Sequence, residues 1–297
     1  MIEWTGIEVL YWFQAVRDSV PFLQDFFLLV SSKSVYLALP MMVACFFYWM
    51  VDKRKGEIIC LSFISSMVVA TMVKFGMGQP RPWEIDPDIE RVSSYDNDPS
   101  CPSGHTAITT SALGSAALLY GKSVFSAVMI TVIVLTIFAR LFLCVHTPLD
   151  IVAGLTVAVV VSILVWRAVD ISYRDDRSFL LINISFAVMF AILFAVSYLL
   201  WQTPVDILLN DVGFVFGVVL GRLLEHRYVG YEAFKRSDRD VFVQYCVGML
   251  IGAAILLVPH AVLPVIGGGI GGFLIMIWSF VIYPSVMMRR KKGKEEA

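Results

Sequence analysis

Charged residues are scarce in this chain. Only 16% of its 297 residues are Asp, Glu, Lys or Arg, whereas 58% are hydrophobic. A water-soluble domain needs a more polar surface, so the composition excludes an ordinary soluble enzyme. Long apolar stretches recur from Val35 to the C-terminus, and many approach the ~20 residues that a helix needs to cross a bilayer. The composition therefore predicts an all-α, polytopic membrane protein.

The chain also lacks the cysteine patterns of a zinc site or a disulfide framework. Its five cysteines are scattered and form no CxxC pair, so most of them are expected to pack in the interior. A disulfide between Cys101 and Cys144 is the less favoured alternative. A cleavable leader is not expected, because Glu3, Arg17 and Asp18 interrupt the N-terminal region that would form its apolar core.

Nine membrane spans are predicted, after an N-terminal segment of a different character. Residues 1–33 mix Trp, Phe and Leu with charges, which is typical of a helix that lies in the membrane interface. The predicted spans cover residues 35–51, 58–74, 104–120, 123–143, 148–166, 179–200, 207–224, 241–259 and 265–286. The hypothesis is therefore a transmembrane helical bundle that ends in a basic tail at residues 289–297.

The positive charges lie mainly on one side of this predicted bundle. With the basic tail in the cytoplasm, 17 of the 23 Lys and Arg residues fall on the cytoplasmic side and the other 6 on the opposite side. Lys and Arg near span ends favour the cytoplasm, so this bias predicts that the loop after residue 74 is non-cytoplasmic. Lys74, Arg81 and Arg140 are among the six exceptions. Cations held close to the membrane against this rule are expected to have a purpose.

The segment Pro102-Ser103-Gly104-His105 comes immediately before an apolar helix. Ser103 is a natural N-cap, and the backbone amides that follow it would be available to bind an anion. Gly104 has no side chain to obstruct a phosphate oxygen. Taken alone, this segment fits a capped helix start with an interfacial histidine better.

The segment from His146 to Asp150 precedes the next apolar run. Thr147 suits the N-cap, Pro148 the first helical position and Asp150 the first turn. A carboxylate in that turn can fix the tautomer of His146 and leave its other ring nitrogen as a nucleophile. Taken alone, this segment fits better a helix start at which Asp150 only complements the helix dipole and His146 is an interfacial polar residue.

The predicted topology brings these segments to one side of the membrane, together with Lys74, Arg81 and Arg140. Each cation alone could extend to the lipid headgroups. Together with two histidines and two helix starts, they fit the stabilisation of a phosphoryl group. A metal site is the main competitor, but three cations would repel a divalent ion.

The sequence resembles the three-part signature of the type 2 phosphatidic acid phosphatase (PAP2) superfamily. The matching segments are Lys74-x6-Arg81-Pro82, Pro102-Ser103-Gly104-His105 and Arg140-x5-His146-x3-Asp150. The superfamily also includes glucose-6-phosphatase, sphingosine phosphate phosphatases, undecaprenyl pyrophosphate phosphatases and the vanadium haloperoxidases. The resemblance implies a catalytic core of six helices over residues 34–200. About three additional spans are predicted in residues 201–288, outside the part of the chain that the motifs cover.

The resemblance also implies a role for each motif residue. His146 would attack phosphorus to give a phosphohistidine, Asp150 would orient it, and His105 would protonate the leaving oxygen. The phosphoryl oxygens would be held by Lys74, Arg81, Ser103, Gly104 and Arg140. Neither a metal nor another cofactor is implied. Ala139 departs from the family pattern, which usually has a serine there, so one hydrogen bond to phosphate would be missing.

These inferences predict a metal-independent membrane phosphatase that hydrolyses a lipid phosphate or lipid pyrophosphate on the non-cytoplasmic face. A site at the membrane boundary reaches a headgroup while the lipid chain stays in the bilayer. A lipid-to-lipid phosphotransferase and a sugar-phosphate phosphatase are alternatives within the superfamily. A lipid transporter that only binds headgroups is the alternative of a different class, which would need charges along a path through the bilayer.

Partners are expected to be membrane lipids and the lipid substrate, and no nucleic acid. Gly213, Gly217 and Gly221 recur every four residues and form a small-residue face for close helix packing. Packing within the chain is the favoured interpretation of this face, and a homodimer contact is the alternative.

Overall fold

The computed structural model describes residues 6–32, 34–92, 98–233 and 239–295. Lys33, Lys235 and Arg236, three cations of the charge count, lie outside the described residues, as does part of the basic tail. All regular secondary structure in the described part of the chain is helical, which confirms the predicted fold class. Its elements are α1 (Glu8–Ser19), α2 (Phe22–Val30), η2 (Ser34–Ala38), α3 (Leu39–Phe46), η3 (Phe47–Val51), α4 (Lys53–Met77), α5 (Pro82–Ile85), α6 (Gly104–Tyr120), α7 (Val124–Phe142), α8 (Pro148–Ser172), α9 (Asp176–Leu200), α10 (Val205–Leu224), η4 (Glu225–Val229), α11 (Arg239–Val262), α12 (Gly267–Ile277), η5 (Trp278–Ile282) and α13 (Tyr283–Glu295).

The long helices coincide with the predicted spans. Eight helical segments of the described residues are long and apolar enough to cross a membrane. Helix α6, the remaining predicted span, has 17 residues. The first of the eight runs from Phe22 to Val51 and therefore begins inside the segment predicted to lie in the interface, because α2 is itself strongly apolar.

Capping residues set the ends of several helices. The Ser123 side chain accepts a hydrogen bond from the Ser126 N–H at 3.2 Å, and the Asp175 side chain accepts one from the Ser178 N–H at 2.8 Å. These bonds satisfy amides that have no partner within the first helical turn. Helix α6 ends at Gly121, whose φ of 81° lies in a region that glycine adopts without strain.

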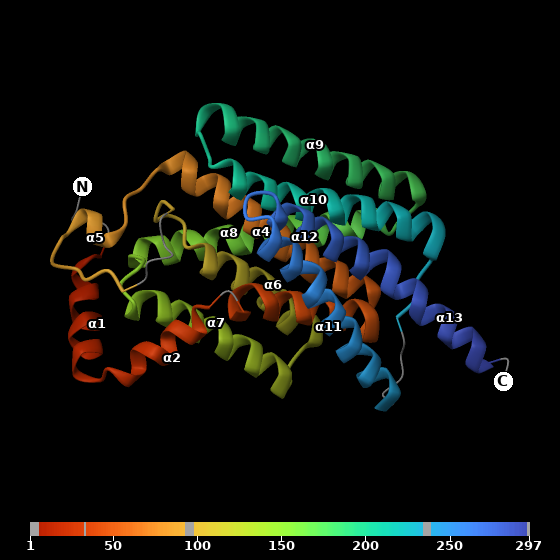
Figure 1. Ribbon diagram of the computed structural model, residues 1–297, viewed down its shortest axis with the longest axis horizontal. Helices are drawn as coiled ribbons and strands as arrows, with labels where there is room; N and C mark the ends of the chain where they lie inside the picture. The colour runs from red at the N-terminus through yellow and green to blue at the C-terminus, as the bar shows by residue number, and fades with distance from the viewer. Residues whose placement is uncertain (1–5, 33, 93–97, 234–238, 296–297) are drawn as a thin grey trace. The chain divides into compact units, whose positions relative to one another are not determined.

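The described chain divides into two compact units, and the first comprises residues 1–44 and 58–165. In this unit α6 packs on α7, and α1 and α2 pack on α7 as well (Figure 1). Leu10, Phe13 and Phe27 from the N-terminal helices form one buried cluster with Phe142 and Val145. The N-terminal helices therefore support the segment that leads to His146.

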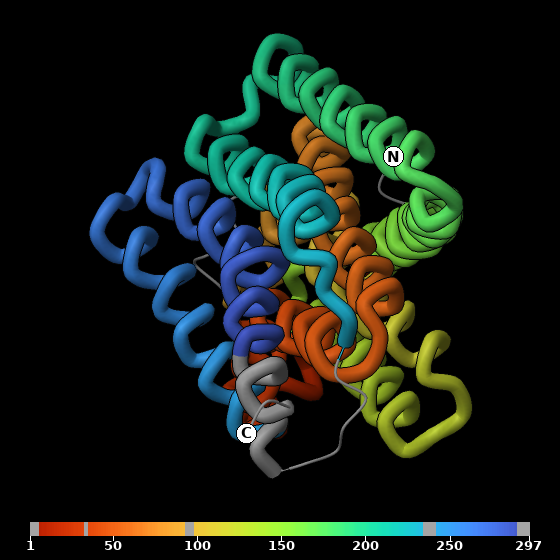
Figure 2. Tube along the Cα trace, turned by 90° about the vertical axis from the view of Figure 1, so that its right-hand side faces the viewer, coloured from red at the N-terminus to blue at the C-terminus, as the bar shows by residue number. Residues whose placement is uncertain are grey.

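The second unit comprises residues 45–57 and 166–297, and α10 lies beside α12 in it (Figure 2). The small-residue face of α10 makes this contact. A methyl group added at Gly213 would lie 2.0 Å from the carbonyl oxygen of Gly269, and one at Gly217 would lie 2.8 Å from that of Phe273. The small-residue face therefore packs within the chain, as the favoured interpretation predicted. A homodimer stays a prediction.

Candidate active site

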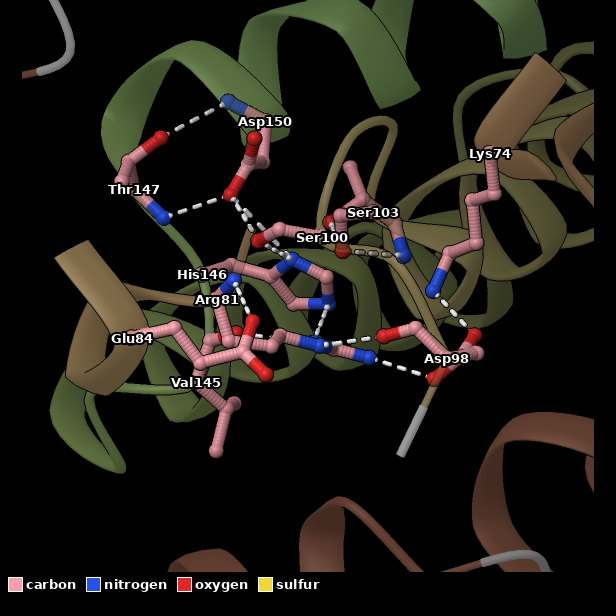
Figure 3. A network of polar contacts seen from close by, with 11 residues as sticks. Lys74, Arg81, Glu84, Asp98, Ser100, Ser103, Val145, His146, Thr147 and Asp150 are labelled. Atoms are coloured by element: carbon pink, nitrogen blue, oxygen red, sulfur yellow. Dashed lines mark hydrogen bonds and ion pairs between the residues drawn. The ribbon is translucent and has the colours of Figure 1, made fainter. Parts of the chain in front are cut away.

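The first unit brings together the segments that the sequence singles out. They are the C-terminal end of α4 with the loop to α5, the loop that enters α6, and the turn between α7 and α8. Figure 3 shows side chains from all three regions joined in one network of polar contacts.

His146 and Asp150 are held together by the start of α8. The Thr147 N–H donates to Asp150 Oδ2 at 2.8 Å, and the Asp150 N–H donates to Thr147 Oγ1 at 3.3 Å (Figure 3). This reciprocal cap fixes the carboxylate in the first turn. His146 Nδ1 lies 3.4 Å from Asp150 Oδ2. The pairing predicted from the i, i+4 spacing is therefore confirmed.

The other ring nitrogen of His146 faces a cation. Nε2 lies 3.2 Å from a terminal nitrogen of Arg81, whose side chain is 2% exposed. A guanidinium only donates hydrogen bonds, so Nε2 must accept here. The neutral ring consequently carries its proton on Nδ1, toward Asp150, and has its lone pair on Nε2.

Burial is the main reason why the pKa of His146 lies well below its ordinary value. The positive charges of Arg81, Arg140 and Lys74 act in the same direction. Both effects disfavour the imidazolium form. His146 therefore stays neutral at pH values where a solvent-exposed histidine is already protonated, and only the neutral form has a lone pair on Nε2.

Ser100 is a member of the network that the sequence analysis missed. Its hydroxyl donates to Asp150 Oδ2 at 2.6 Å and lies 3.5 Å from His146 Nδ1. The Ser103 N–H also donates to the backbone carbonyl of Asp150 at 3.0 Å. The loop before α6 is thus tied to the start of α8, and a serine two residues before a motif gives no signal of this contact.

Asp98 was also missed, although it contacts two of the predicted phosphate-binding cations. Its carboxylate accepts from Lys74 Nζ and from an Arg81 terminal nitrogen, each at 2.5 Å (Figure 3). Its backbone carbonyl accepts from Arg81 Nε at 2.8 Å. Burial alone would raise the pKa of Asp98, but Lys74 and Arg81 outweigh burial and lower it. Asp98 is therefore ionised near neutral pH.

The predicted cap of α6 is present. Ser103 Oγ accepts from the Thr106 N–H at 3.5 Å and from the Thr106 hydroxyl at 3.0 Å. A methyl group added at Gly104 would meet only Lys74 Cε, at 3.9 Å. The packing of the chain itself does not require a glycine there. This fits the expectation that Gly104 leaves space for a ligand.

His105 is held by the N-terminal part of the chain. Its Nε2 lies 3.0 Å from the carbonyl oxygen of Ser31, and its ring centroid lies 3.7 Å from that of Tyr36. A carbonyl oxygen only accepts, so Nε2 carries a proton. The contacts of Ser31 and Tyr36 with this histidine could not be predicted from local sequence patterns, because the residues are about 70 positions apart.

Arg140 and Ala139 lie in the last turn of α7. The Arg140 side chain is 2% exposed, and its charge lowers the pKa of His146. Ala139 is fully buried in the apolar cluster with Phe142. This position therefore supplies no hydroxyl, as its departure from the expected serine implied. Cys101 and Cys144, the alternative disulfide pair, are both free.

Comparison with known proteins gives two family matches. A model described as the PAP2 superfamily matches residues 56–174 and covers all three motif segments. A model described as the transmembrane extension of PAP2 superfamily phosphatases matches residues 209–295. Searches of curated proteins and of solved structures found no match. The predicted boundary between a core of residues 34–200 and additional helices at 201–288 stays a prediction.

Proposed function

The chain belongs to the PAP2 superfamily and is a membrane phosphatase, and from this premise we propose that it removes phosphate from a lipid through a phosphohistidine on His146. One observation carries the choice of nucleophile. His146 has Asp150 on one ring nitrogen and Arg81 beside the other, so its lone pair points to the cations. His105 is bonded to a backbone carbonyl instead.

The first step forms the covalent intermediate. His146 Nε2 attacks phosphorus, and the bond from phosphorus to the lipid oxygen breaks. His105 enters this step with a second proton on Nδ1, because its Nε2 proton is bonded to the Ser31 carbonyl. It donates the Nδ1 proton to the leaving oxygen, so the lipid leaves as an alcohol or, from a pyrophosphate, as a monophosphate. Asp150 stabilises the positive charge that develops on the ring. Lys74, Arg81 and Arg140 hold the phosphoryl oxygens, whose charge the transition state spreads.

The second step regenerates the enzyme. A water molecule gives a proton to His105, and its oxygen attacks the phosphorus of the phosphohistidine. The bond to Nε2 breaks and inorganic phosphate is released. If a lipid hydroxyl replaced water, the same intermediate would give phosphotransfer, which is the alternative within the superfamily.

The surroundings of the site support a lipid substrate. The motif residues lie at helix ends, where a headgroup meets the bilayer surface. Helices α7 and α8 both expose large apolar side chains, among them Val128, Val134, Val152 and Ile163. Such faces suit contact with lipid chains. A lipid substrate bound at these helix ends would place its chain against the same apolar surface.

Metal independence is supported by the charge of the site. Lys74, Arg81 and Arg140 would repel a divalent ion. No three His, Cys, Asp or Glu side chains of the described residues are arranged as metal ligands. We expect phosphate release by the purified protein to survive EDTA and to be inhibited by vanadate. Complete loss in EDTA with recovery on a divalent ion would contradict the proposal.

A substrate panel tests the lipid assignment. Phosphate release should be compared for phosphatidic acid, phosphatidylglycerol phosphate, an isoprenoid pyrophosphate, a sphingoid phosphate and glucose 6-phosphate. Preference for the water-soluble ester would contradict a lipid substrate. Binding of lipid phosphates without release of phosphate would favour the transporter alternative.

We also propose that the site faces the non-cytoplasmic side. Ser94 lies in the loop that the charge bias predicts to be on this side, but it is outside the described residues. Asp88 lies in the same loop and is exposed. A cysteine at Asp88 should react with an impermeant thiol reagent in intact cells. Labelling only after permeabilisation would reverse the orientation.

A further inference from the structure

The Asp98 carboxylate is paired with two of the cations that are expected to bind phosphate. Its two carboxylate oxygens each accept a 2.5 Å hydrogen bond, one from Lys74 and one from Arg81. The other two nitrogens of Arg81 donate to the Asp98 carbonyl at 2.8 Å and to the Val145 carbonyl at 2.8 Å. All three Arg81 nitrogens are thus engaged. A phosphoryl group that accepts from the same N–H groups of Lys74 and Arg81 has to displace the carboxylate.

The position of the Asp98 carboxylate allows it to move away from Lys74 and Arg81. The Asp98 side chain is 33% exposed, whereas those of Lys74 and Arg81 are 7% and 2% exposed. Asp98 lies in the loop before α6, while its partners lie on α4 and at the start of α5. Rotation of the side chain toward solvent would keep the bond between Arg81 and the Asp98 carbonyl. The cations would stay in place.

Displacement of Asp98 costs the same free energy for every anion that takes its place. The phosphodiester of a bulk phospholipid carries one negative charge, as the carboxylate does, and therefore gains little by the exchange. A phosphate monoester has a second pKa of about 6 and carries nearly two charges at neutral pH. It gains more from the same cations.

We propose that Asp98 competes with every incoming anion for Lys74 and Arg81, so that the singly charged phosphodiester headgroups of bulk lipids do not occupy the site, whereas a doubly charged phosphate monoester still does. This inference rests on the proposed function, because it assumes that these cations bind the substrate phosphate. Such competition matters at a membrane surface, where bulk headgroups greatly outnumber the substrate.

The first test measures binding, so it does not depend on turnover. The probe is inorganic phosphate, titrated calorimetrically into the purified full chain, with diethyl phosphate as the singly charged diester. Asp98→Asn should lower the Kd for both anions by about tenfold, which corresponds to about 1.4 kcal/mol. The effect should be similar for both because the same displacement cost is removed. Asp88→Asn is the matched control, because it removes an exposed carboxylate from the same segment between α5 and α6. This variant should bind both anions as tightly as the unaltered protein does.

The second test measures competition during catalysis. In mixed micelles, a rising fraction of phosphatidylglycerol should raise the apparent KM of Asp98→Asn and change that of the unaltered protein little. Asp98→Ala serves as a second variant, and thermal unfolding checks that both fold. Weaker phosphate binding by the folded variants would show that Asp98 holds the cations in position. Unchanged binding would show that Asp98 does not compete with phosphate for Lys74 and Arg81. Either result overturns the proposal. If the Asp98 variants bind both anions more tightly as expected but the unaltered protein releases no phosphate from any substrate, the proposed hydrolysis is contradicted and the role of Asp98 is not.

Discussion

The second compact unit buries an arginine among partners that all lie on helices. Arg222 donates to Glu57 Oε2 from two nitrogens, at 2.8 and 3.1 Å, and to Asn183 Oδ1 at 3.0 Å. In the same unit, Lys53 pairs with Glu225 at 2.6 Å. These two cations face two carboxylates, and the Arg222 and Glu57 side chains are only 3% and 2% exposed.

The first unit arranges the same side-chain types differently. Lys74, Arg81 and Arg140 are buried cations of the candidate site, and the carboxylates of its network are those of Asp98, Asp150 and Glu84. Asp98 is partly exposed and lies on a loop, so the proposed exchange for another anion moves no helix.

This difference separates a structural ion network from a binding site. Taking charges out of water is costly, and a balanced set with fixed partners compensates that cost permanently. A replaceable, partly exposed partner leaves part of the compensation to a ligand. Buried charge alone therefore does not distinguish the candidate site from a structural network. Its replaceable carboxylate and its histidines do.

Removal of the proposed nucleophile in the first unit should cause the largest loss of activity. His146→Ala should abolish turnover and any acid-labile phosphoenzyme, a loss of at least ~10³-fold if the covalent route is the only efficient one. Rapid-quench labelling with a radiolabelled substrate measures the intermediate directly.

His105→Ala provides the matched comparison. With p-nitrophenyl phosphate the leaving group needs little protonation, so this variant should lose less activity than it loses with a lipid phosphate. If the phosphoenzyme forms normally in His146→Ala and disappears in His105→Ala, the two histidines have been assigned the wrong roles.

Breaking the balanced network should lower stability instead of catalysis. Glu57→Leu leaves Arg222 buried without its carboxylate and should cost about 3–5 kcal/mol. The double variant Glu57→Leu with Arg222→Met should recover much of that loss, because it removes both charges. Unfolding in mixed detergent measures the free energies, and kcat per folded molecule should stay the same. If Glu57→Leu were as stable as the unaltered protein, the Arg222 network would not be a structural network, and the comparison between the two units would fail.

The cations that surround His146 should affect the pH dependence. The pKa of His146 is lowered by burial and then by Arg81, Arg140 and Lys74, so the neutral form of this proposed nucleophile persists into the acidic range. Arg140→Gln removes one cation and should raise that pKa toward its ordinary value. The acidic limb of kcat/KM, which reports the free enzyme, should then move to higher pH. Arg91→Gln removes an exposed cation of the same unit and is the control. An acidic limb that does not move would show that Arg140 does not act on His146.

Much of this fold could be predicted from the sequence because the bilayer fixes the length and apolarity of its helices. The predicted start of the span at residue 104 and the caps at Ser103 and Thr147 agree with the structure, since capping depends on residues close in the chain. The pairing of His146 with Asp150 could be predicted for the same reason.

The missed contacts join residues that are far apart in the chain. Ser100 bonds to Asp150, and Ser31 bonds to His105. Glu57 and Arg222 are separated by 165 positions. Hydropathy and local spacing contain no information on which helix ends meet, so these partners depend on tertiary packing. Asp98 was missed for a further reason, because a carboxylate among phosphate-binding cations contradicts the simple expectation of a purely cationic site.

The smallest effect is expected for an exposed ion pair of the second unit. Arg54 pairs with Asp170, and their side chains are 46% and 49% exposed. Water already solvates both charges, so the pair should contribute no more than about 1 kcal/mol. Arg54→Gln should therefore shift the unfolding free energy far less than Glu57→Leu does, although each change removes one member of an arginine–carboxylate pair. If the two variants were equally destabilised in the same unfolding measurement, burial could not be what distinguishes the Arg222 network from an ordinary surface ion pair.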